Sequence, residues 1–431
     1  MSLSYADKLS YREDLGGSLG SPELFDSEDE LRRKVKELAI LVRAARKIVA
    51  FTGAGISTSC GIPDFRGPSG IWTLQRAGKP LPKPKVSFAL AKPSFTHGAL
   101  ASLMKYPTGK LAYVVSQNVD GLHLRSGIPR HRLAELHGNS FAERCPQCRR
   151  EYIRDFEIES VGFKETPRTC LDCKCFLRDH CLDWEDALPE DELRDAEKHS
   201  RESDLAICLG TSLQISPACN LPLRTIRTYT SCKEKTEPGK LVIINLQKTQ
   251  HDKKAVTSGG AVIRAKADDV MRMLMKELDI PVGAYARKDM VNYEWKQGKR
   301  GIIVSVWSRH GASWPLPFLQ FIRVRITNDR DEDTVVEAHK HPFKVEYEGG
   351  DVKRMVLELW LEGEDRPILK DVEIGPSKAL VGKCLEWEFV SQVVQYDVEK
   401  AEDENGNRGK RHKKNVNQAG GTSSSSSSHS L

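Results

Sequence analysis

One stretch near the N-terminal third decides the fold: Val49-Ala50-Phe51-Thr52-Gly53-Ala54-Gly55-Ile56-Ser57-Thr58-Ser59-Cys60-Gly61-Ile62-Pro63-Asp64-Phe65-Arg66-Gly67. An apolar run from Ile48 to Phe51 ends at Gly53 and Gly55, and small residues follow that can open a helix. This pattern predicts a strand, a tight turn and a helix N-terminus, where a pyrophosphate can approach the backbone and meet free N–H groups. The spacing departs from GxGxxG, so a plain turn that needs glycine stays an alternative.

Three residues directly behind this turn favour a ligand site. Asp64, Phe65 and Arg66 follow Pro63 and place a carboxylate, an aromatic ring and a guanidinium side by side. The next segment, residues 67–85, is rich in proline, and we expect a loop without regular structure there. Such a loop is either a lid over a ligand or a surface excursion.

Length, charge and cysteine content limit the class of protein. The length of 431 residues suggests two or three domains, and the net charge of +6 is too small to indicate nucleic-acid binding. No apolar run approaches the ~20 residues of a membrane span, and residues 1–20 lack the apolar core of a secretory signal, so we expect no membrane contact. Eleven cysteines without such a signal indicate a reducing compartment, where clustered thiols bind metal more often than they form disulfides.

Residues up to about 281 follow an α/β pattern. Ser27 is the predicted N-cap of a helix with apolar positions from Leu31 to Ala45, and a second helix covers 93–105. Asp268 and Asp269 are expected to cap a helix that runs to Leu278. The alternation of strands and helices predicts a parallel sheet.

Three further buried-type strands, at 111–116, 204–209 and 241–244, end in small or polar residues. Ligands of parallel sheets gather at the carboxyl ends of strands, so the residues after these strands are candidate ligand contacts. These candidates are Gln117, Asn118, Asp120, Gly210, Thr211, Ser212, Asn245, Leu246 and Gln247. His137 follows another apolar pair, and the pattern alone leaves a structural and a catalytic role open for it.

Two CxxC pairs predict a metal site. Cys145 and Cys148 form the first pair and Cys170 and Cys173 the second, a spacing typical of a four-thiolate zinc ribbon. Cys175 is an alternative second member of the later pair. We expect the remaining cysteines to behave as small apolar residues: they are Cys60, Cys181, Cys208, Cys219, Cys232 and Cys384.

The pattern changes near residue 301 to short alternating or β-branched runs. These runs, at 302–307, 318–326, 342–347, 352–360 and 385–394, predict a separate antiparallel β domain, a sandwich. Beyond Glu399 the chain is poor in apolar residues and is expected to be disordered. Its basic cluster at 409–414 is either a nuclear-import or nucleic-acid patch or a solvated charge run.

Taken together and in this order, the motifs resemble the sirtuins over residues 31–281. They are Gly53-Ala54-Gly55-Ile56-Ser57, Gly61-Ile62-Pro63-Asp64-Phe65-Arg66-Gly67, Gln117-Asn118-Val119-Asp120, Leu136-His137-Gly138-Asn139, the cysteine pairs, Gly210-Thr211-Ser212 and Asn245-Leu246-Gln247. Residues 182–189 and 118–123 are similar to those of the nuclear, chromatin-directed branch of the family.

The resemblance implies a fold and a division of the chain. The expected fold is α/β, a Rossmann-like parallel sheet with a small zinc-ribbon module, followed by a C-terminal β-rich domain and a disordered tail. The expected units are an N-terminal extension (1–30), an NAD-binding catalytic domain (31–140 and 195–282), a zinc-binding insert (141–194), the β-rich domain (300–398) and the tail (399–431). The last two lie outside the family core.

The resemblance also implies an activity, NAD-dependent deacylation of protein lysine with release of nicotinamide. In it the acyl oxygen attacks the ribose carbon, and a base then activates a ribose hydroxyl. By resemblance His137 is that base, and Asn118 and Asp120, together with Gln117, orient the ribose and nicotinamide. Phe65 shields the reactive face, and Trp184 frames the substrate channel.

The implied ligands are NAD and one structural zinc ion. The expected NAD contacts are Gly53, Ala54, Gly55, Thr58, Asp64, Phe65, Arg66, Trp72, Gln117, His137, Gly210, Thr211, Ser212, Asn245, Leu246 and Gln247. The expected zinc ligands are Cys145, Cys148, Cys170 and Cys173. The resemblance does not settle an adenine contact near Ala267, because residues 257–267 lack the His-Gly of close relatives.

The implied substrates are acylated lysines on histone tails or other nuclear proteins, and the implied place is chromatin in the nucleus. Mono-ADP-ribosyl transfer to protein and removal of longer acyl groups at the same site stay open. An adaptor that binds chromatin with a vestigial site is a third hypothesis, although His137, Asn118, Asp120 and Arg66 are all present. A hydride-transferring dehydrogenase is disfavoured by the glycine spacing and the cysteine insert.

Overall fold

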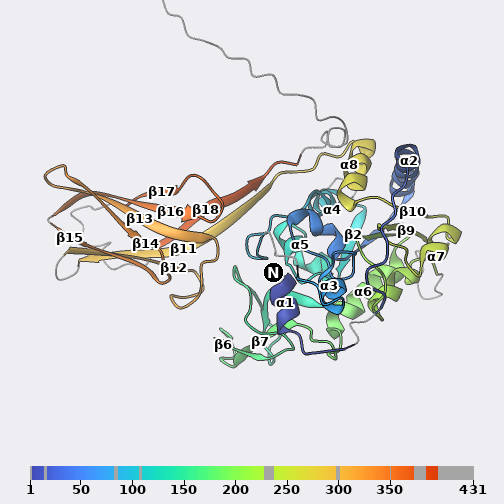
Figure 1. The fold of residues 1–431 in the computed structure, drawn as a ribbon, viewed down its shortest axis with the longest axis horizontal. Coiled ribbons are helices and arrows are strands. Elements are labelled where there is room, and N and C mark those ends of the chain that lie inside the picture. Colours follow the sequence, from blue (N-terminus) through green and yellow to red (C-terminus); the bar gives the residue numbers. More distant parts are fainter. Residues whose placement is uncertain are drawn as a thin grey trace, which may run out of the picture.

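The computed structural model describes most of the chain up to residue 396. The described ranges are 2–13, 17–81, 86–105, 109–227, 237–297, 301–349, 351–372 and 385–396. The predicted disordered tail with its basic cluster, and Cys232 and Cys384, lie outside these ranges. Figure 1 shows two parts, an α/β part and a part of long strands that follows it in the chain.

A six-stranded parallel sheet forms the centre of the α/β part. Its order is β10-β9-β8-β1-β2-β3, and all neighbouring strands are parallel. The strands are β1 Ile48–Thr52, β2 Leu111–Ser116, β3 Leu133–Glu135, β8 Leu205–Leu209, β9 Lys240–Ile244 and β10 Ala261–Ile263. Nearly every residue of the four central strands is buried, because helices cover both faces of the sheet. The predicted Rossmann-like sheet is confirmed.

The helices form two layers around this sheet. One face is covered by α2 Glu28–Ala44, α4 Phe95–Lys105 and α8 Ala267–Leu278. The other is covered by α6 Glu190–Glu202, η4 Ala218–Arg224 and α7 Asp252–Thr257. Shorter helices are α1 Ser2–Lys8, α5 Leu122–Arg125 and η3 Arg130–Arg132. Among the described residues, the helices are too short or too polar for any of them to cross a membrane.

The predicted helix starts differ in outcome. Ser27 is the N-cap of α2, and its hydroxyl accepts a hydrogen bond from Glu30 N at 3.3 Å, as predicted. The predicted cap of α8 is wrong, because Lys266 holds the N-cap position without a side-chain bond. Asp268 instead accepts hydrogen bonds from Ser59 Oγ (2.8 Å) and Thr96 N (2.9 Å), so it ties α8 to the turn after β1 and to α4.

The turn after β1 does not open an α-helix, and that prediction is wrong. Two short 3₁₀ turns follow instead, η1 Ala54–Ile56 and η2 Thr58–Cys60. They end at Gly61, whose φ of +83° reverses the chain before Pro63. The predicted strand and tight turn are confirmed, but the N–H groups there belong to turns and not to a helix end.

The loop expected at 67–85 contains a helix, α3 Ile71–Arg76. Ile71 N and Trp72 N bond to the carbonyls of Asp64 and Phe65, and the side chains of Ile71 and Trp72 are buried. Burial of two large apolar side chains therefore orders a segment in which proline content suggested none. Pro82, Pro84 and their neighbours at 82–85 lie outside the described residues.

A small antiparallel sheet, β5-β4-β7-β6, carries the cysteines. Its strands are β4 Gly138–Arg144, β5 Glu151–Ile153, β6 Glu165–Thr169 and β7 Phe176–Cys181. We call residues 138–181 the cysteine-rich module. Strand β4 begins directly after His137, so the module is continuous with the edge of the parallel sheet.

The strands after residue 285 form the predicted sandwich. One sheet has the order β15-β12-β11-β18 and the other β14-β13-β16-β17, and both are antiparallel. The strands are β11 Tyr285–Gln297, β12 Gly301–Ser308, β13 Leu319–Asn328, β14 Asp333–Ala338, β15 Phe343–Glu348, β16 Val352–Leu361, β17 Ile368–Val372 and β18 Leu385–Val394. The inner faces share one apolar core.

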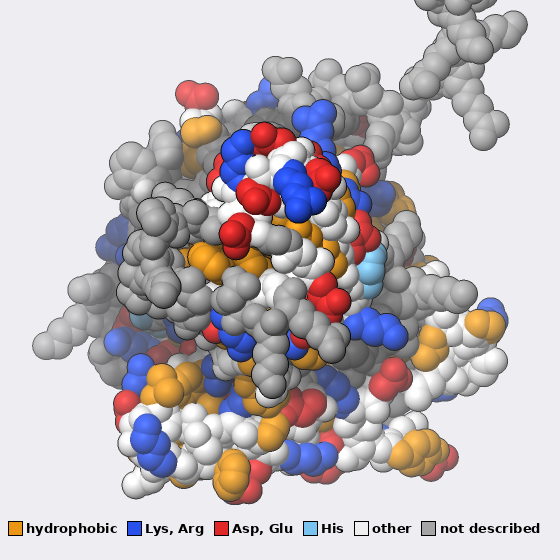
Figure 2. Space-filling view, turned by 90° about the vertical axis from the view of Figure 1, so that its left-hand side faces the viewer, with side chains coloured by type: hydrophobic (Ala, Val, Ile, Leu, Met, Phe, Trp, Pro, Cys, Tyr) orange, Lys and Arg blue, Asp and Glu red, His pale blue; other side chains and the backbone are white. Residues whose placement is uncertain are grey.

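The sequence missed β11, β14 and β17. Strand β11 lies in residues 283–299, which the expected division left unassigned, and its charged residues hide the alternation. The division into domains stays a prediction. Figure 2 looks onto the end of the sandwich, where basic and acidic side chains are interspersed in the coloured area and neither sign dominates.

Candidate active site

A cavity of about 910 Å³ opens at the carboxyl ends of β1, β2, β8 and β9. The sixteen expected NAD contacts all line it, and so do Asn118, Trp184 and Ala267. The sheet brings these residues together because parallel strands end at one edge. Asp120 is buried nearby and does not line the cavity.

Three glycines let the loops after β1 and β8 touch. Gly55 N donates to the Gly210 carbonyl at 2.9 Å, and Gly53 N donates to the Leu209 carbonyl at 3.1 Å. A Cβ on Gly53 would lie 2.7 Å from Gly210 O, and one on Gly55 would lie 2.7 Å from Gly210 Cα. Gly210 itself has a φ of +57°. The close approach of backbone to backbone therefore requires these glycines, whatever ligand the cavity takes.

A hydrogen-bond chain fixes Asn118. Its Nδ2 donates to the Gly53 carbonyl at 3.1 Å and lies 3.4 Å from Ser57 Oγ. Ser57 Oγ in turn donates to Asp120 at 2.7 Å, and the other Asp120 oxygen accepts from Leu122 N at 2.9 Å. Asp120 therefore acts through Ser57 on the placement of Asn118, and its expected direct contact with a ligand has no support from its position.

His137 is held in one tautomer. Its Nδ1 lies 3.0 Å from the Gln117 carbonyl, which can only accept, so Nδ1 carries the proton and Nε2 keeps a lone pair. Burial lowers the pKa of His137 to about 4, although the bond to Gln117 acts in the opposite direction. The imidazole is therefore neutral near pH 7 and able to accept a proton at Nε2.

Aromatic rings form one wall of the cavity. Phe65 and Trp72 lie 4.5 Å apart between ring centroids, and Trp72 and Trp184 lie 4.8 Å apart. The Arg66 guanidinium lies over Trp72 at 4.5 Å, and the Tyr5 ring meets the edge of Phe65 at 6.3 Å. Such a wall suits a flat, partly apolar ligand.

Several expected contacts already have partners within the chain, Asp64 and Gln247 among them. Asp64 accepts from Gly67 N at 3.1 Å and closes its own turn, and burial raises the pKa of Asp64. Gln247 Nε2 donates to the Ser21 carbonyl at 2.6 Å. Both side chains line the cavity, yet they also shape it from within.

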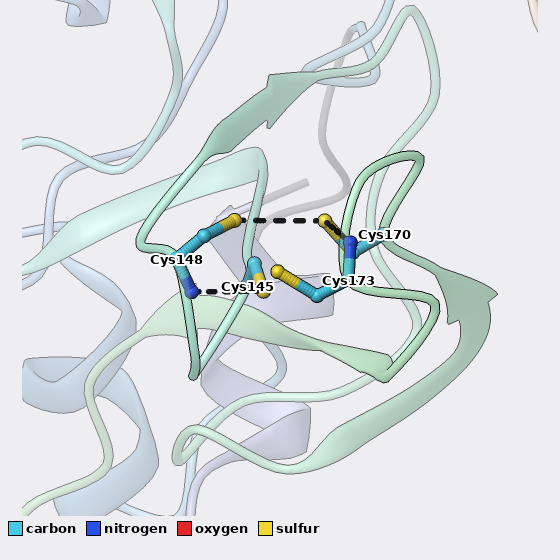
Figure 3. Close-up of side chains that lie close together, drawn as sticks. All are labelled: Cys145, Cys148, Cys170 and Cys173. Atoms are coloured by element: carbon cyan, nitrogen blue, oxygen red, sulfur yellow. Dashed lines mark hydrogen bonds between the residues drawn. The ribbon is translucent and has the colours of Figure 1, made fainter.

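The four predicted thiols meet at one end of the cysteine-rich module. The sulfur atoms of Cys145, Cys148, Cys170 and Cys173 all lie within 4.8 Å of one another, and Figure 3 shows them converging from two loops. Tetrahedral zinc with Zn–S bonds of about 2.3 Å needs sulfurs about 3.8 Å apart, so the donor set fits zinc. Cys175 Sγ lies 3.3 Å from Cys145 Sγ, so the fifth thiol stays a neighbour of the site.

A second group, Glu151, His180 and Glu192, also lies close together. Arg130 pairs with Glu151 at 2.7 Å, and Arg144 pairs with Glu192 at 2.7 Å. The two guanidinium groups already balance the two carboxylates. This group is therefore an ion-pair network and not a metal site.

Comparison with known proteins decides the family. A model of the Sir2 family matches residues 83–217. The chain is 49% identical over 354 residues to the NAD-dependent protein deacetylase SRT1 of Oryza sativa subsp. indica, with 81% of this chain and 70% of that protein covered. It is 44% identical over 295 residues to the NAD-dependent protein deacetylase Sirt6 of Drosophila melanogaster, with 66% and 88% covered. The chain belongs to the Sir2 family.

A third relative agrees with this assignment. The SRT1 protein of Arabidopsis thaliana is 50% identical over 352 residues, with 80% of this chain and 71% of that protein covered. The predicted resemblance to the sirtuins, as members of the Sir2 family are also called, is confirmed.

In this member of the Sir2 family, the sequence missed a set of cavity residues. They are Tyr5, Leu9, Arg12, Gly17 and Glu23 near the N-terminus, and Leu182, Leu188, Leu193, Gln214, Ile215, Ser216, Pro217, Ala265, Lys266 and Asp268 further along. One signal was available, because Tyr5 and Leu9 are four residues apart, a spacing that places two side chains on one face when a segment is helical.

The N-terminal segment crosses the cavity mouth of this Sir2-family chain. Tyr5 Oη donates to the Leu182 carbonyl at 3.0 Å, and the Arg12 guanidinium lies over Trp184 at 5.5 Å. Ser18 N donates to Gln214 Oε1 at 2.6 Å. The expected N-terminal extension is therefore part of the cavity wall.

Proposed function

We propose that the chain is an NAD-dependent protein-lysine deacetylase. The observation that carries the proposal is the neutral His137 in a cavity lined by the sixteen residues that the family resemblance assigns to NAD. The names of the three relatives, all NAD-dependent protein deacetylases, support the activity.

His137 is the general base of this proposal. When bound, NAD supplies a ribose carbon that becomes reactive toward the acyl oxygen as nicotinamide leaves. Nε2 of His137 accepts the proton of a ribose hydroxyl, and the Gln117 carbonyl stabilises the imidazolium through Nδ1–H. Lysine then leaves as the free amine, and one water molecule supplies the oxygen and protons that complete the transfer of the acyl group to ADP-ribose.

Asn118 and the aromatic wall position the reactants. We assign Oδ1 of Asn118 to the ligand, since Gly53 fixes Nδ2 on the other side. Phe65, Trp72 and Trp184 exclude water from the reacting carbon and hold the apolar part of the acyl-lysine. Asp120 is a positioning residue that acts through Ser57.

A zinc ion held by Cys145, Cys148, Cys170 and Cys173 is structural in this proposal. Four thiolates leave no position for a substrate, and the ion would join the two loops of a module with a small apolar core. The expected division into catalytic domain, zinc insert and β-rich domain belongs to the same proposal.

The proposed substrates are acetylated lysines of histone tails in nuclear chromatin. The support is the similarity of residues 182–189 to the nuclear branch of the family and the basic cluster at 409–414. Fluorescence microscopy tests the nuclear location. A fluorescent fusion of the full chain should concentrate in nuclei, and a fusion that lacks residues 409–414 should not.

The test is release of nicotinamide from NAD by the full chain, with and without an acetylated histone-tail peptide. We expect release that depends on the peptide and falls at least 100-fold in His137→Ala, because general bases contribute about 10²–10⁴ in rate. The matched control is His131→Ala, since His131 is exposed and outside the cavity.

The possible results separate the hypotheses. Release with peptide and transfer of acetyl to ADP-ribose establishes the deacetylase. Nicotinamide release with ADP-ribose bound to protein instead supports mono-ADP-ribosyl transfer, and activity only on longer acyl peptides supports a long-chain deacylase. No release with any peptide or nucleosome contradicts the proposal and favours the adaptor.

A further inference from the structure

The sandwich contacts the α/β part at an irregular segment, residues 86–94. The carbonyls of Ala89, Leu90 and Pro93 lie in no strand or helix, and buried carbonyls need partners. Side chains of the sandwich supply them. Arg287 of β11 donates to the Ala89 carbonyl, and Gln392 of β18 donates to the Leu90 carbonyl at 3.1 Å.

The end of the sandwich adds a third contact to the same segment. Tyr396 Oη donates to the Pro93 carbonyl at 2.9 Å. Its ring packs on α4 at Gly98, where a Cβ would lie only 2.6 Å from the ring. Leu90 in turn packs against the core of the sandwich. Figure 1 shows β11 and β18 reaching toward the α/β part at this place.

This segment lies under the turn that carries Asn118. Phe88, Ala89 and Ala91 share an apolar cluster with Val119 and Leu122, the neighbours of Asn118 and Asp120. Arg125, three residues after Leu122, donates to the Phe88 carbonyl at 2.6 Å. One face of the segment is therefore held by the sandwich and the other supports the turn.

A second contact joins the sandwich to the cysteine-rich module. Trp314, between β12 and β13, stacks on Phe156 with centroids 5.8 Å apart, and the Arg168 guanidinium lies over Trp314 at 4.4 Å. His310 of the same connection lies 3.3 Å from Arg154 and 3.4 Å from Asp155.

The residues on the module side lead back to His137. Arg154 and Arg168 both bond to Glu143, which is buried on β4, at 2.6 and 2.5 Å. Strand β4 starts at Gly138, directly after His137. The two contacts of the sandwich therefore lie behind two sides of the cavity, one that carries Asn118 and one that carries His137.

We propose that the sandwich is a brace that fixes the cysteine-rich module relative to the parallel sheet, with Trp314, Gln392 and Tyr396 as positioning residues for the reaction. The inference rests on the proposed function for its kinetic test alone. Reacting groups must be placed closely, and a misplacement of about 1 Å can lower a rate about 100-fold. A brace held at both ends limits such movement between His137 and Asn118.

The test uses the full chain with each end of the brace weakened. Trp314→Ala removes the ring stack at the module end, and Gln392→Ala with Tyr396→Phe removes two of the three hydrogen bonds at the other end. We expect kcat for nicotinamide release to fall about 3- to 10-fold in each case, with KM for NAD within twofold and zinc content unchanged. Hydrogen exchange should quicken at 118–122 and at 138–145 in both variants.

Combining the two sets of substitutions gives the sharpest result. A brace needs both ends, so the combined variant should lose little more kcat than either set alone. Two independent stabilising contacts would instead multiply their effects, as distant sites usually do. Multiplied effects, or wild-type kcat and exchange in all variants, would overturn the inference.

The control variants are Trp360→Ala and Lys288→Ala. Trp360 stacks on Phe321 within the sandwich, and Lys288 pairs with Glu388 on its exposed surface. Both should keep wild-type kcat, and an equal loss in Trp360→Ala would mean that general loosening and not the brace is responsible. If the wild type releases no nicotinamide, the proposed function fails while hydrogen exchange still tests the brace.

Discussion

Ser57 contacts two polar side chains of the candidate site, those of Asp120 and Asn118. Its hydroxyl donates to Asp120 and lies beside Nδ2 of Asn118, and all three side chains are buried. A buried carboxylate oxygen without a donor destabilises a fold by about 1–3 kcal/mol or more. Ser57 therefore links the stability of the turn to the orientation of Asn118.

The first prediction follows from this link. Ser57→Ala should lower kcat for nicotinamide release about tenfold and the free energy of unfolding by about 1–3 kcal/mol, because Asp120 loses a donor. Kinetics and urea unfolding measure the two effects. Ser59→Ala is the control. Ser59 lies two residues after Ser57, is exposed, and donates its hydrogen bond to Asp268 and not to Asp120. Equal effects of both substitutions would contradict the role of Ser57.

At the scale of elements, regular periodicity decided what could be predicted. The four central strands are apolar throughout and end in small or polar residues, so both the sheet and its edge could be located. The turn after β1 could not, because its shape depends on distant partners such as Gly210 and Asp120. Helix α3 could not, because burial of Ile71 and Trp72 orders it. Local sequence carries no information about those contacts.

The cysteine-rich module gives the second prediction. Cys145→Ser and Cys173→Ser should each release zinc and lower the melting temperature, because the ion would supply part of the module's folding free energy. Cys175→Ser should keep one zinc per chain. Zinc content measured by atomic spectroscopy decides this. If Cys175→Ser lost zinc and Cys173→Ser kept it, Cys175 and not Cys173 would be the fourth zinc ligand.

The candidate site itself was predictable in membership but not in roles. Residue types and strand ends indicated which side chains would face one cavity. Hydrogen-bond partners made Asp120 a support for Ser57 and made Gln247 a partner of Ser21, and neither follows from spacing. The N-terminal wall was missed because its one periodic pair, Tyr5 and Leu9, stands in a mostly polar segment.

At the scale of the whole molecule, buried histidines link stability to pH. Burial lowers the pKa of His97, His137, His180 and His310 to about 4 and that of His123 to about 3. In the unfolded chain the same groups bind protons near pH 6.5. Between pH 6.5 and 4 the unfolded state therefore holds more protons than the folded state, and stability falls as pH falls.

The third prediction is a loss of stability in mild acid. Each histidine lowers the free energy of unfolding by up to about 1.4 kcal/mol per pH unit within this window. Four carboxyl groups oppose the effect, because burial raises the pKa of Glu135 to about 8, that of Asp155 to about 6, and those of Asp64 and Asp179 above their usual value. Histidines outnumber them, so the urea midpoint should be lower at pH 5 than at pH 7.5. An equal or higher urea midpoint at pH 5 would contradict the proposed link between the buried histidines and stability.

The contact between Gly55 and Gly210 has a consequence for protein engineering. A side chain at either position would collide with main-chain atoms of the other loop, so no change of a neighbouring side chain can make room for it. Both positions must therefore stay glycine in a combinatorial library. Changes to what this cavity accepts can instead be made at lining positions that are not glycine, such as Ala54, Thr58 and Ser212.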